Sequence, residues 1–107
     1  MGFFLMRCVH HPGRDADRDA HRPAHRDWVG SGGKGLVSVL IGSATTDGAG
    51  ASTGNFGILE AASAEDARRF AEGDPFNAAG IVSGIEIIPL ADGLQAHRIT
   101  DPMSPRL

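Results

Sequence analysis

The 107-residue chain has little cysteine, little net charge and no long apolar run. Its one cysteine, Cys8, excludes an intrachain disulfide and a multi-cysteine zinc site, and it suggests a reducing compartment. The net charge of −3 gives no electrostatic reason to bind nucleic acid, because phosphate binding requires a basic surface. The apolar runs are too short to cross a bilayer, and Met1–Val9 lacks the basic start of a signal peptide. We expect one cytoplasmic domain with no nucleic-acid or membrane partner.

Glycine, in contrast, is abundant, and many of the 15 glycines gather in two clusters around a predicted strand, Leu36–Ile41. The first cluster, Gly30–Gly35, superficially resembles a phosphate-binding loop. That motif needs a strand before it and a helix after it, so we interpret the cluster as a helix-to-strand connection. The second cluster begins at Gly42, and its small side chains have little to bury. We therefore predict a mobile loop over Gly42–Gly54.

Periodicity and capping residues divide the rest of the chain into strands and helices. Pro23 is expected to interrupt any helix that runs through Arg14–Arg26, because proline removes a helical hydrogen bond. The predicted strands are Phe3–His10, Leu36–Ile41, Asn55–Ala61 and a stretch within Ile81–Leu90. The predicted helices are a short one capped by Asp15 or Asp17, a second over about Pro23–Gly30, and a third that follows the cap Ser63.

The resulting order is strand, helix, strand, strand, helix, strand. This order is typical of the ferredoxin-like α+β fold, an antiparallel βαββαβ sheet with its helices on one face. The other face of the sheet then needs a cover, and a second copy of the chain would supply one, so we predict a homodimer. We assign residues 1–91 to the folded domain and residues 92–107 to a C-terminal tail, since the latter show no clear period.

The octet Gly73–Gly80 offers the clearest candidate for a functional element. Asp74 is a favoured helix N-cap, proline fits the first helical position that follows, and Gly80 can end the helix in a left-handed conformation. A carboxylate held on such a short rigid element could orient a histidine, and His25 is our candidate. The alternative is that Asp74 only caps the helix and His25 is an ordinary surface histidine.

Other polar residues suggest weaker hypotheses. Arg22 precedes His25 by nearly one turn and could hold an anionic or phenolate substrate, or it could simply be solvated. The chain also contains His10, His11 and His21, but no recognisable ligand motif includes them, and Pro23 separates His21 from His25. We therefore expect no metal, and we interpret Cys8 as a core residue rather than a nucleophile.

Several of these residues together resemble the YciI-like (YCII-related domain) family. The resemblance spans about Phe3 to Pro89 and rests on Arg22-Pro23-Ala24-His25, on Gly42, and on Asp74-Pro75-Phe76 with Ala79-Gly80 and Pro89. The sequence departs from the family pattern at Ser43, where proline is frequent, and at Arg26, where an apolar residue is common. Ser43 adds a hydroxyl and flexibility to the expected pocket.

The resemblance implies a dimeric α+β barrel with a pocket and a His–Asp dyad, which maps onto His25 and Asp74 as catalytic residues. Gly42, Ser43 and Phe76 are then expected, with Arg22, to contact substrate. The implied function is a small-molecule enzyme without cofactor that transfers a proton in elimination, isomerisation or hydrolysis on a small cyclic or anionic substrate. Lyase activity of the dehydrochlorinase type and hydrolase activity are the implied classes. The alternative is a non-catalytic dimer that binds a small molecule or serves as an accessory module.

Overall fold

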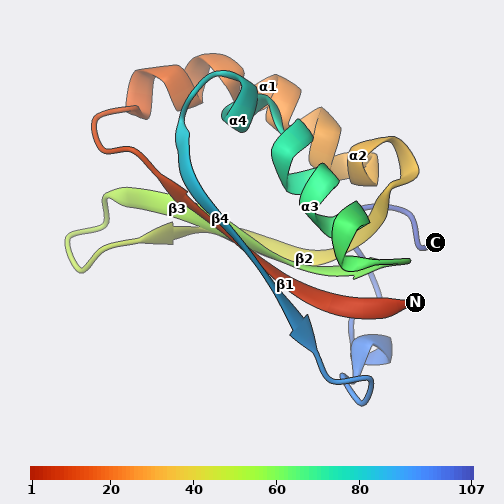
Figure 1. Cartoon of the computed structure of the whole chain (residues 1–107). Coiled ribbons are helices and arrows are strands. Elements are labelled where there is room, and N and C mark those ends of the chain that lie inside the picture. Colours follow the sequence, from red (N-terminus) through yellow and green to blue (C-terminus); the bar gives the residue numbers. More distant parts are fainter.

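A computed structural model describes residues 1–107 and contains one four-stranded sheet with helices on one of its faces (Figure 1). The strands lie in the order β2-β3-β1-β4, and all neighbouring pairs are antiparallel. Their bounds are β1 (Gly2–His10), β2 (Val37–Thr46), β3 (Ser52–Ala61) and β4 (Val82–Leu90). The helices are α1 (Asp15–Gly30), α2 (Gly32–Gly35), α3 (Ala64–Gly73) and α4 (Pro75–Ala78), followed by the 3-10 turn η1 (Ala96–Arg98). This is the predicted ferredoxin-like α+β fold.

The hydrophobic core lies between the sheet and α3. Alternate residues of β1, including Phe4 and Cys8, are buried on the helix-covered face, and Phe70 packs onto them from α3. Burial raises the pKa of the Cys8 thiol to about 12, so the group is a protonated core side chain rather than a nucleophile. The expectation of a core cysteine is confirmed.

Helix α1 corrects two expectations about the segment before β2. It runs without interruption from Asp15 to Gly30 although Pro23 lies inside it. Pro23 is exposed, so the backbone carbonyl that loses its helical partner can be hydrated instead. The N-cap is Arg14, whose side chain makes no capping bond, whereas Asp15 and Asp17 lie in the first turn. There the two carboxylates interact favourably with the positive end of the helix dipole rather than cap the helix.

The predicted mobile loop over Gly42–Gly54 is also wrong, because β2 and β3 form a long hairpin through most of it. Gly42 pairs with Gly57 and Thr45 with Gly54, and residues 47–51 make the turn. The small residues allow close strand contact rather than mobility. A Cβ at Gly54 would lie 2.0 Å from the carbonyl oxygen of Cys8, so only glycine fits that position.

The capping predictions around α3 and α4 are confirmed. The Ser63 side chain accepts a hydrogen bond from the backbone of Asp66, and the Asp74 side chain accepts one from the backbone of Phe76. Gly80 adopts a left-handed φ of 74°, which ends α4 and lets the chain enter β4. These local signals fix the position of Asp74 between α3 and α4.

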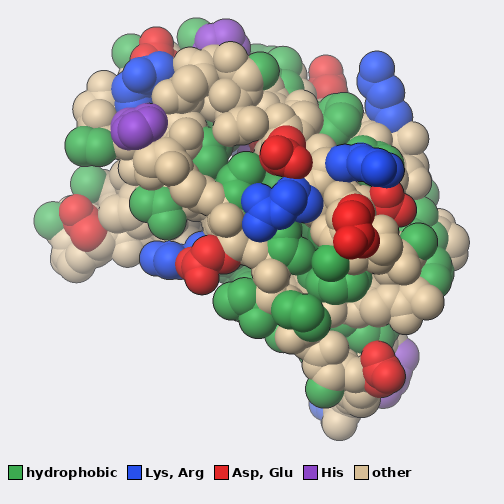
Figure 2. Space-filling view, viewed as in Figure 1, with side chains coloured by type: hydrophobic (Ala, Val, Ile, Leu, Met, Phe, Trp, Pro, Cys, Tyr) green, Lys and Arg blue, Asp and Glu red, His purple; other side chains and the backbone are tan.

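The residues after β4 return to the free edge of β2. Ser104 is buried, its backbone nitrogen donates to Val39 O at 3.1 Å, and its hydroxyl accepts from Val39 N at 2.7 Å. No helix of the chain combines the length and hydropathy needed to span a membrane. Figure 2 shows acidic and basic side chains intermixed over the visible face, without a continuous basic area.

Candidate active site

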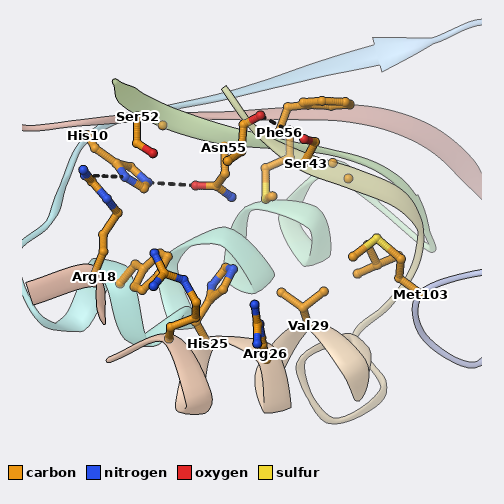
Figure 3. A pocket seen from close by; sticks show the side chains of 18 of the residues that line it. His10, Arg18, His25, Arg26, Val29, Ser43, Ser52, Asn55, Phe56 and Met103 are labelled. Carbon is orange, nitrogen blue, oxygen red and sulfur yellow. Dashed lines mark hydrogen bonds between the residues drawn. The ribbon is translucent and has the colours of Figure 1, made fainter. Parts of the chain in front are cut away.

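A pocket of about 330 Å³ lies between α1 and the sheet (Figure 3). Helix α1 turns one face toward it, because its lining residues recur three or four positions apart. These residues are Arg18, Arg22, His25, Arg26, Val29 and Gly30. The continuity of α1 through its internal proline is what aligns them along one wall.

His25 and Asp74, which are 49 positions apart in the sequence, meet at this wall. The imidazole Nδ1 of His25 lies 2.8 Å from Asp74 Oδ2 and 2.9 Å from Oδ1. Both side chains are largely buried, with exposed fractions of 17% and 8%. An ionised carboxylate can only accept hydrogen bonds, so Nδ1 carries a proton and donates a hydrogen bond to Asp74. The His25 Nε2 atom has no hydrogen-bond partner in the protein, and His25 lines the pocket.

Phe76 holds the histidine from one side. Its buried ring stacks on the His25 imidazole with centroids 4.1 Å apart and an angle of 5° between the planes. The backbone nitrogen of Phe76 also donates to Asp74 Oδ1 at 2.8 Å. A single short helix therefore positions both the carboxylate and the ring that constrain His25, which reduces the rotational freedom of the imidazole.

A second polar cluster, formed by His10, Arg18 and Asn55, lies in the same pocket. His10 Nε2 is 2.8 Å from Asn55 Oδ1, and His10 Nδ1 is 3.4 Å from an Arg18 guanidinium nitrogen. The pKa of His10 is lowered, mainly because burial disfavours the charged imidazolium. His10 also contacts the edge of Phe76, with ring centroids 5.7 Å apart, so this phenyl ring touches both histidines.

The remaining predicted contact residues border the pocket in different ways. Arg22 lines it while also pairing with Asp19 at 2.5 Å. Gly42 lies on the sheet wall, where it pairs with Gly57. Ser43 is also at the border, but it is one residue out of phase with Gly42, and its hydroxyl donates to the carbonyl of Ala44 at 2.9 Å. The side chains of a strand alternate between faces, so the Ser43 hydroxyl belongs to the opposite face.

The electrostatic character of the lining is uniform. Arg18, Arg22 and Arg26 all contribute, and no aspartate or glutamate lines the pocket. Arg26 forms no ion pair or hydrogen bond through its side chain, unlike the other two arginines. No group of three or more His, Cys, Asp or Glu side chains comes together in a way that could hold a metal ion. A cationic cavity in a protein of negative net charge favours an anionic ligand.

Sequence reasoning missed His10, Arg18 and Asn55 as pocket residues. The alternation of Phe4, Met6 and Cys8 along β1 extends to His10 and could have placed it on the buried face. Arg18 is seven positions before His25, which is two helical turns, but the expected break at Pro23 concealed this relationship. For Asn55 the sequence carries no signal beyond its place on β3.

Comparisons with known proteins agree with the architecture. The family model for the YCII-related domain matches residues 2–91. The chain is similar to 5-chloro-2-hydroxyhydroquinone dehydrochlorinase from Burkholderia phenoliruptrix AC1100, solved in complex with 2,5-dihydroxybenzoquinone, with a TM-score of 0.71 and 28% sequence identity. That match covers 85% of this chain and 95% of the dehydrochlorinase. A search of curated proteins finds no match.

Proposed function

The chain belongs to the YCII-related domain family, and from this premise we propose that it is a small-molecule enzyme in which His25 transfers a proton. The observation that carries the proposal is the contact of 2.8 Å between His25 Nδ1 and Asp74 Oδ2. The other ring nitrogen, Nε2, has no hydrogen-bond partner in the protein, and His25 lines the pocket. A carboxylate that keeps Nδ1 protonated leaves the lone pair on Nε2, where it can accept a proton. In this proposal Asp74 orients the histidine and does not itself exchange the proton.

The reaction class we favour is elimination. The ring first takes up a proton at the carbon that carries the leaving group, while one of its hydroxyls loses a proton and becomes a carbonyl. Nε2 of His25 then takes the proton of a second hydroxyl, whose electron pair forms the second carbonyl and a new ring double bond and expels the leaving group as an anion. With a chlorinated hydroxyhydroquinone the net change is the loss of HCl. The similarity to the dehydrochlorinase supports this class of substrate.

The arginines on α1 supply the binding energy for such a substrate. Arg22 and Arg26 lie one turn apart at the pocket, and guanidinium groups form charge-assisted hydrogen bonds with phenolate or carboxylate oxygens. Met6 and Phe76 provide apolar contact for the ring. We therefore assign a small, anionic, oxygenated ring as the substrate class.

Replacement of His25 tests the function directly. We expect His25→Gln to lower the rate of chloride release from 5-chloro-2-hydroxyhydroquinone by about 10²- to 10⁴-fold, the usual contribution of a general base. His21→Gln is the matched control, because His21 is exposed on the same helix and does not line this pocket. Equal rates in both variants would reject the role of His25. Binding of the compound without chloride release by the wild type would favour the non-catalytic alternative.

We also propose that the chain forms a homodimer through the face of the sheet that carries no helices. One apolar row crosses all four strands there, because Ile41 pairs with Ile58, Ile58 with Leu5, and Leu5 with Ile88. Ile41 and Ile88 are 48% and 41% exposed in the single chain. A continuous apolar row of this kind marks an association surface.

Sedimentation at micromolar concentration tests the dimer. Ile88→Glu would place a charge in the apolar row of the proposed contact, so we expect this variant to sediment as a monomer while the wild type sediments as a dimer. Leu107→Glu is the control, since Leu107 is 48% exposed but lies at the C-terminus. A monomeric wild type would remove the proposal.

A further inference from the structure

The hydrogen bonds of the second cluster determine where the proton of His10 lies. A guanidinium group can only donate, so Arg18 must donate to His10 Nδ1 over their distance of 3.4 Å. Nδ1 therefore bears a lone pair, the imidazole is neutral, and its proton is on Nε2. The lowered pKa of His10 agrees with a neutral ring. Arg18 is itself held by an ion pair with Asp15.

The same logic fixes the orientation of the Asn55 amide. His10 Nε2 carries the proton, so its partner at 2.8 Å must be the amide oxygen rather than the amide nitrogen. The Asn55 Nδ2 group then points away from His10, and no protein group accepts its hydrogen bonds. Figure 3 shows Asn55 projecting from β3 into the space that His25 borders from α1. Because the amide oxygen is held by His10 and the amide nitrogen has no protein partner, the Asn55 side chain presents a hydrogen-bond donor in a fixed orientation.

From this arrangement we infer that the Asn55 Nδ2 group is a substrate-binding donor that holds a carbonyl or phenolate oxygen on the sheet side of the pocket, across from His25. His10 and Arg18 are positioning residues that hold the amide in the donating orientation. The inference rests on the proposed function for the identity of the substrate and deepens it. The ligand must carry oxygens at opposite edges of one small ring, one for Asn55 and one within reach of His25.

The apolar centre of the pocket fits such a ring. Phe76 contacts both His10 and His25, with centroid distances of 5.7 Å and 4.1 Å, so one phenyl group borders both polar ends. Met6 and Val39 line the pocket between the polar side chains of the sheet. A ligand that lacked the second oxygen would leave the Asn55 donor without a partner, which disfavours binding.

Binding of 2,5-dihydroxybenzoquinone to Asn55 variants tests the inference. Asn55→Asp keeps the shape and still accepts from His10, but it replaces the donor with a negative oxygen, so we expect the Kd to rise by about 100-fold. Asn55→Ala removes the whole amide, both the donor and the acceptor for His10, without adding a charge, and should raise the Kd by about 10-fold. Thr53→Ala is the matched control, because Thr53 is an exposed residue of the same strand that bonds only Thr45. An unchanged Kd in both Asn55 variants, or no binding by the wild type, would overturn the inference.

A nitrogen-15 NMR spectrum of the histidines tests the positioning role of His10, because it reports which ring nitrogen of each histidine carries the proton. We expect His10 as the Nε2–H tautomer and His25 as the Nδ1–H tautomer in the same molecule. The Nδ1–H form of His10 would overturn the assigned amide orientation.

The two proposals also fail separately. Loss of turnover in His25→Gln with normal quinone binding in Asn55→Asp rejects only the donor, and the reverse pair of results rejects only the proposed base.

Discussion

Asp74 accepts hydrogen bonds from two elements at once, and substitution can separate its two roles. In Asp74→Asn the amide oxygen can still accept from Phe76 N, the capping contact of 2.8 Å. The amide nitrogen then takes the place of Oδ2, 2.8 Å from His25 Nδ1, and because it can only donate, it favours the imidazole proton on Nε2. The cap survives, but the nitrogen that should accept a proton is already protonated. We therefore expect a folded protein with an inactive histidine.

The magnitudes follow from these contacts. Asp74→Asn exchanges a charge-assisted bond for a neutral one, which should lower the free energy of unfolding by about 1 kcal/mol. Asp74→Ala loses the cap as well, worth about 1 kcal/mol, and the whole histidine bond, worth about 1.5–3 kcal/mol. The alanine variant should thus be about 3 kcal/mol less stable than the wild type. Turnover should fall by about 10²- to 10⁴-fold in both variants.

Urea unfolding, the rate of chloride release and the nitrogen-15 shifts of His25 measure these three effects. The decisive comparison is between the two variants, since the asparagine variant should lose activity without a matching loss of stability. Turnover within about 3-fold of the wild type in Asp74→Asn would refute the reasoning, because a general base in the wrong tautomer loses at least about 10²-fold. A His25 tautomer that does not change in that variant would refute it as well.

Three further predictions concern the scaffold. Ser104→Ala leaves the buried Val39 N–H without an acceptor and should lower the unfolding free energy by about 1–3 kcal/mol in urea; no change would mean the tail is not docked. Gly54→Ala should cost at least about 2 kcal/mol because of its backbone clash, whereas Gly48→Ala, with nothing within 4 Å of its Cβ, should not; equal stabilities would contradict the packing. The pKa of Cys8 is raised from 9.0 to about 12, so the unfolded chain releases this proton first and stability should fall between pH 9 and pH 12. The Cys8→Ala variant should show a shallower fall, and identical pH profiles would contradict the burial of the thiol.

The order of elements and the caps of α3 and α4 could be predicted because each depends on neighbours in the sequence. Ser63 and Asp74 bind backbone groups two or three residues away, and Gly80 adopts its left-handed conformation for the same local reason. The proximity of His25 to Asp74 could be predicted only with the family resemblance, since nothing local links residues 49 positions apart. That distinction explains why the fold followed from pattern and the contact did not.

The failures arose where tertiary packing opposed a local preference. Pro23 disfavours a helix interior, yet the pocket face and the Trp28 side chain, which donates to Phe70 O at 3.0 Å, keep α1 continuous. The glycines after Ile41 suggested a loop, but Gly42 pairs with β3 and Gly54 pairs with both β1 and β2, so only Gly48 and Gly50 remain in the turn. His10 was missed because its surroundings come from α1 and β3, and no contiguous motif records them.

A crystal structure with 2,5-dihydroxybenzoquinone would test the account most directly, by the distance from His25 Nε2 to the ligand. We predict a ligand oxygen within hydrogen-bond distance of this nitrogen, about 2.6–3.2 Å, with the ring packed against the apolar lining between α1 and the sheet. A quinone bound elsewhere on the protein, or one held in the pocket with its oxygens turned away from His25, would contradict the assignment of His25 as the proton-transferring group.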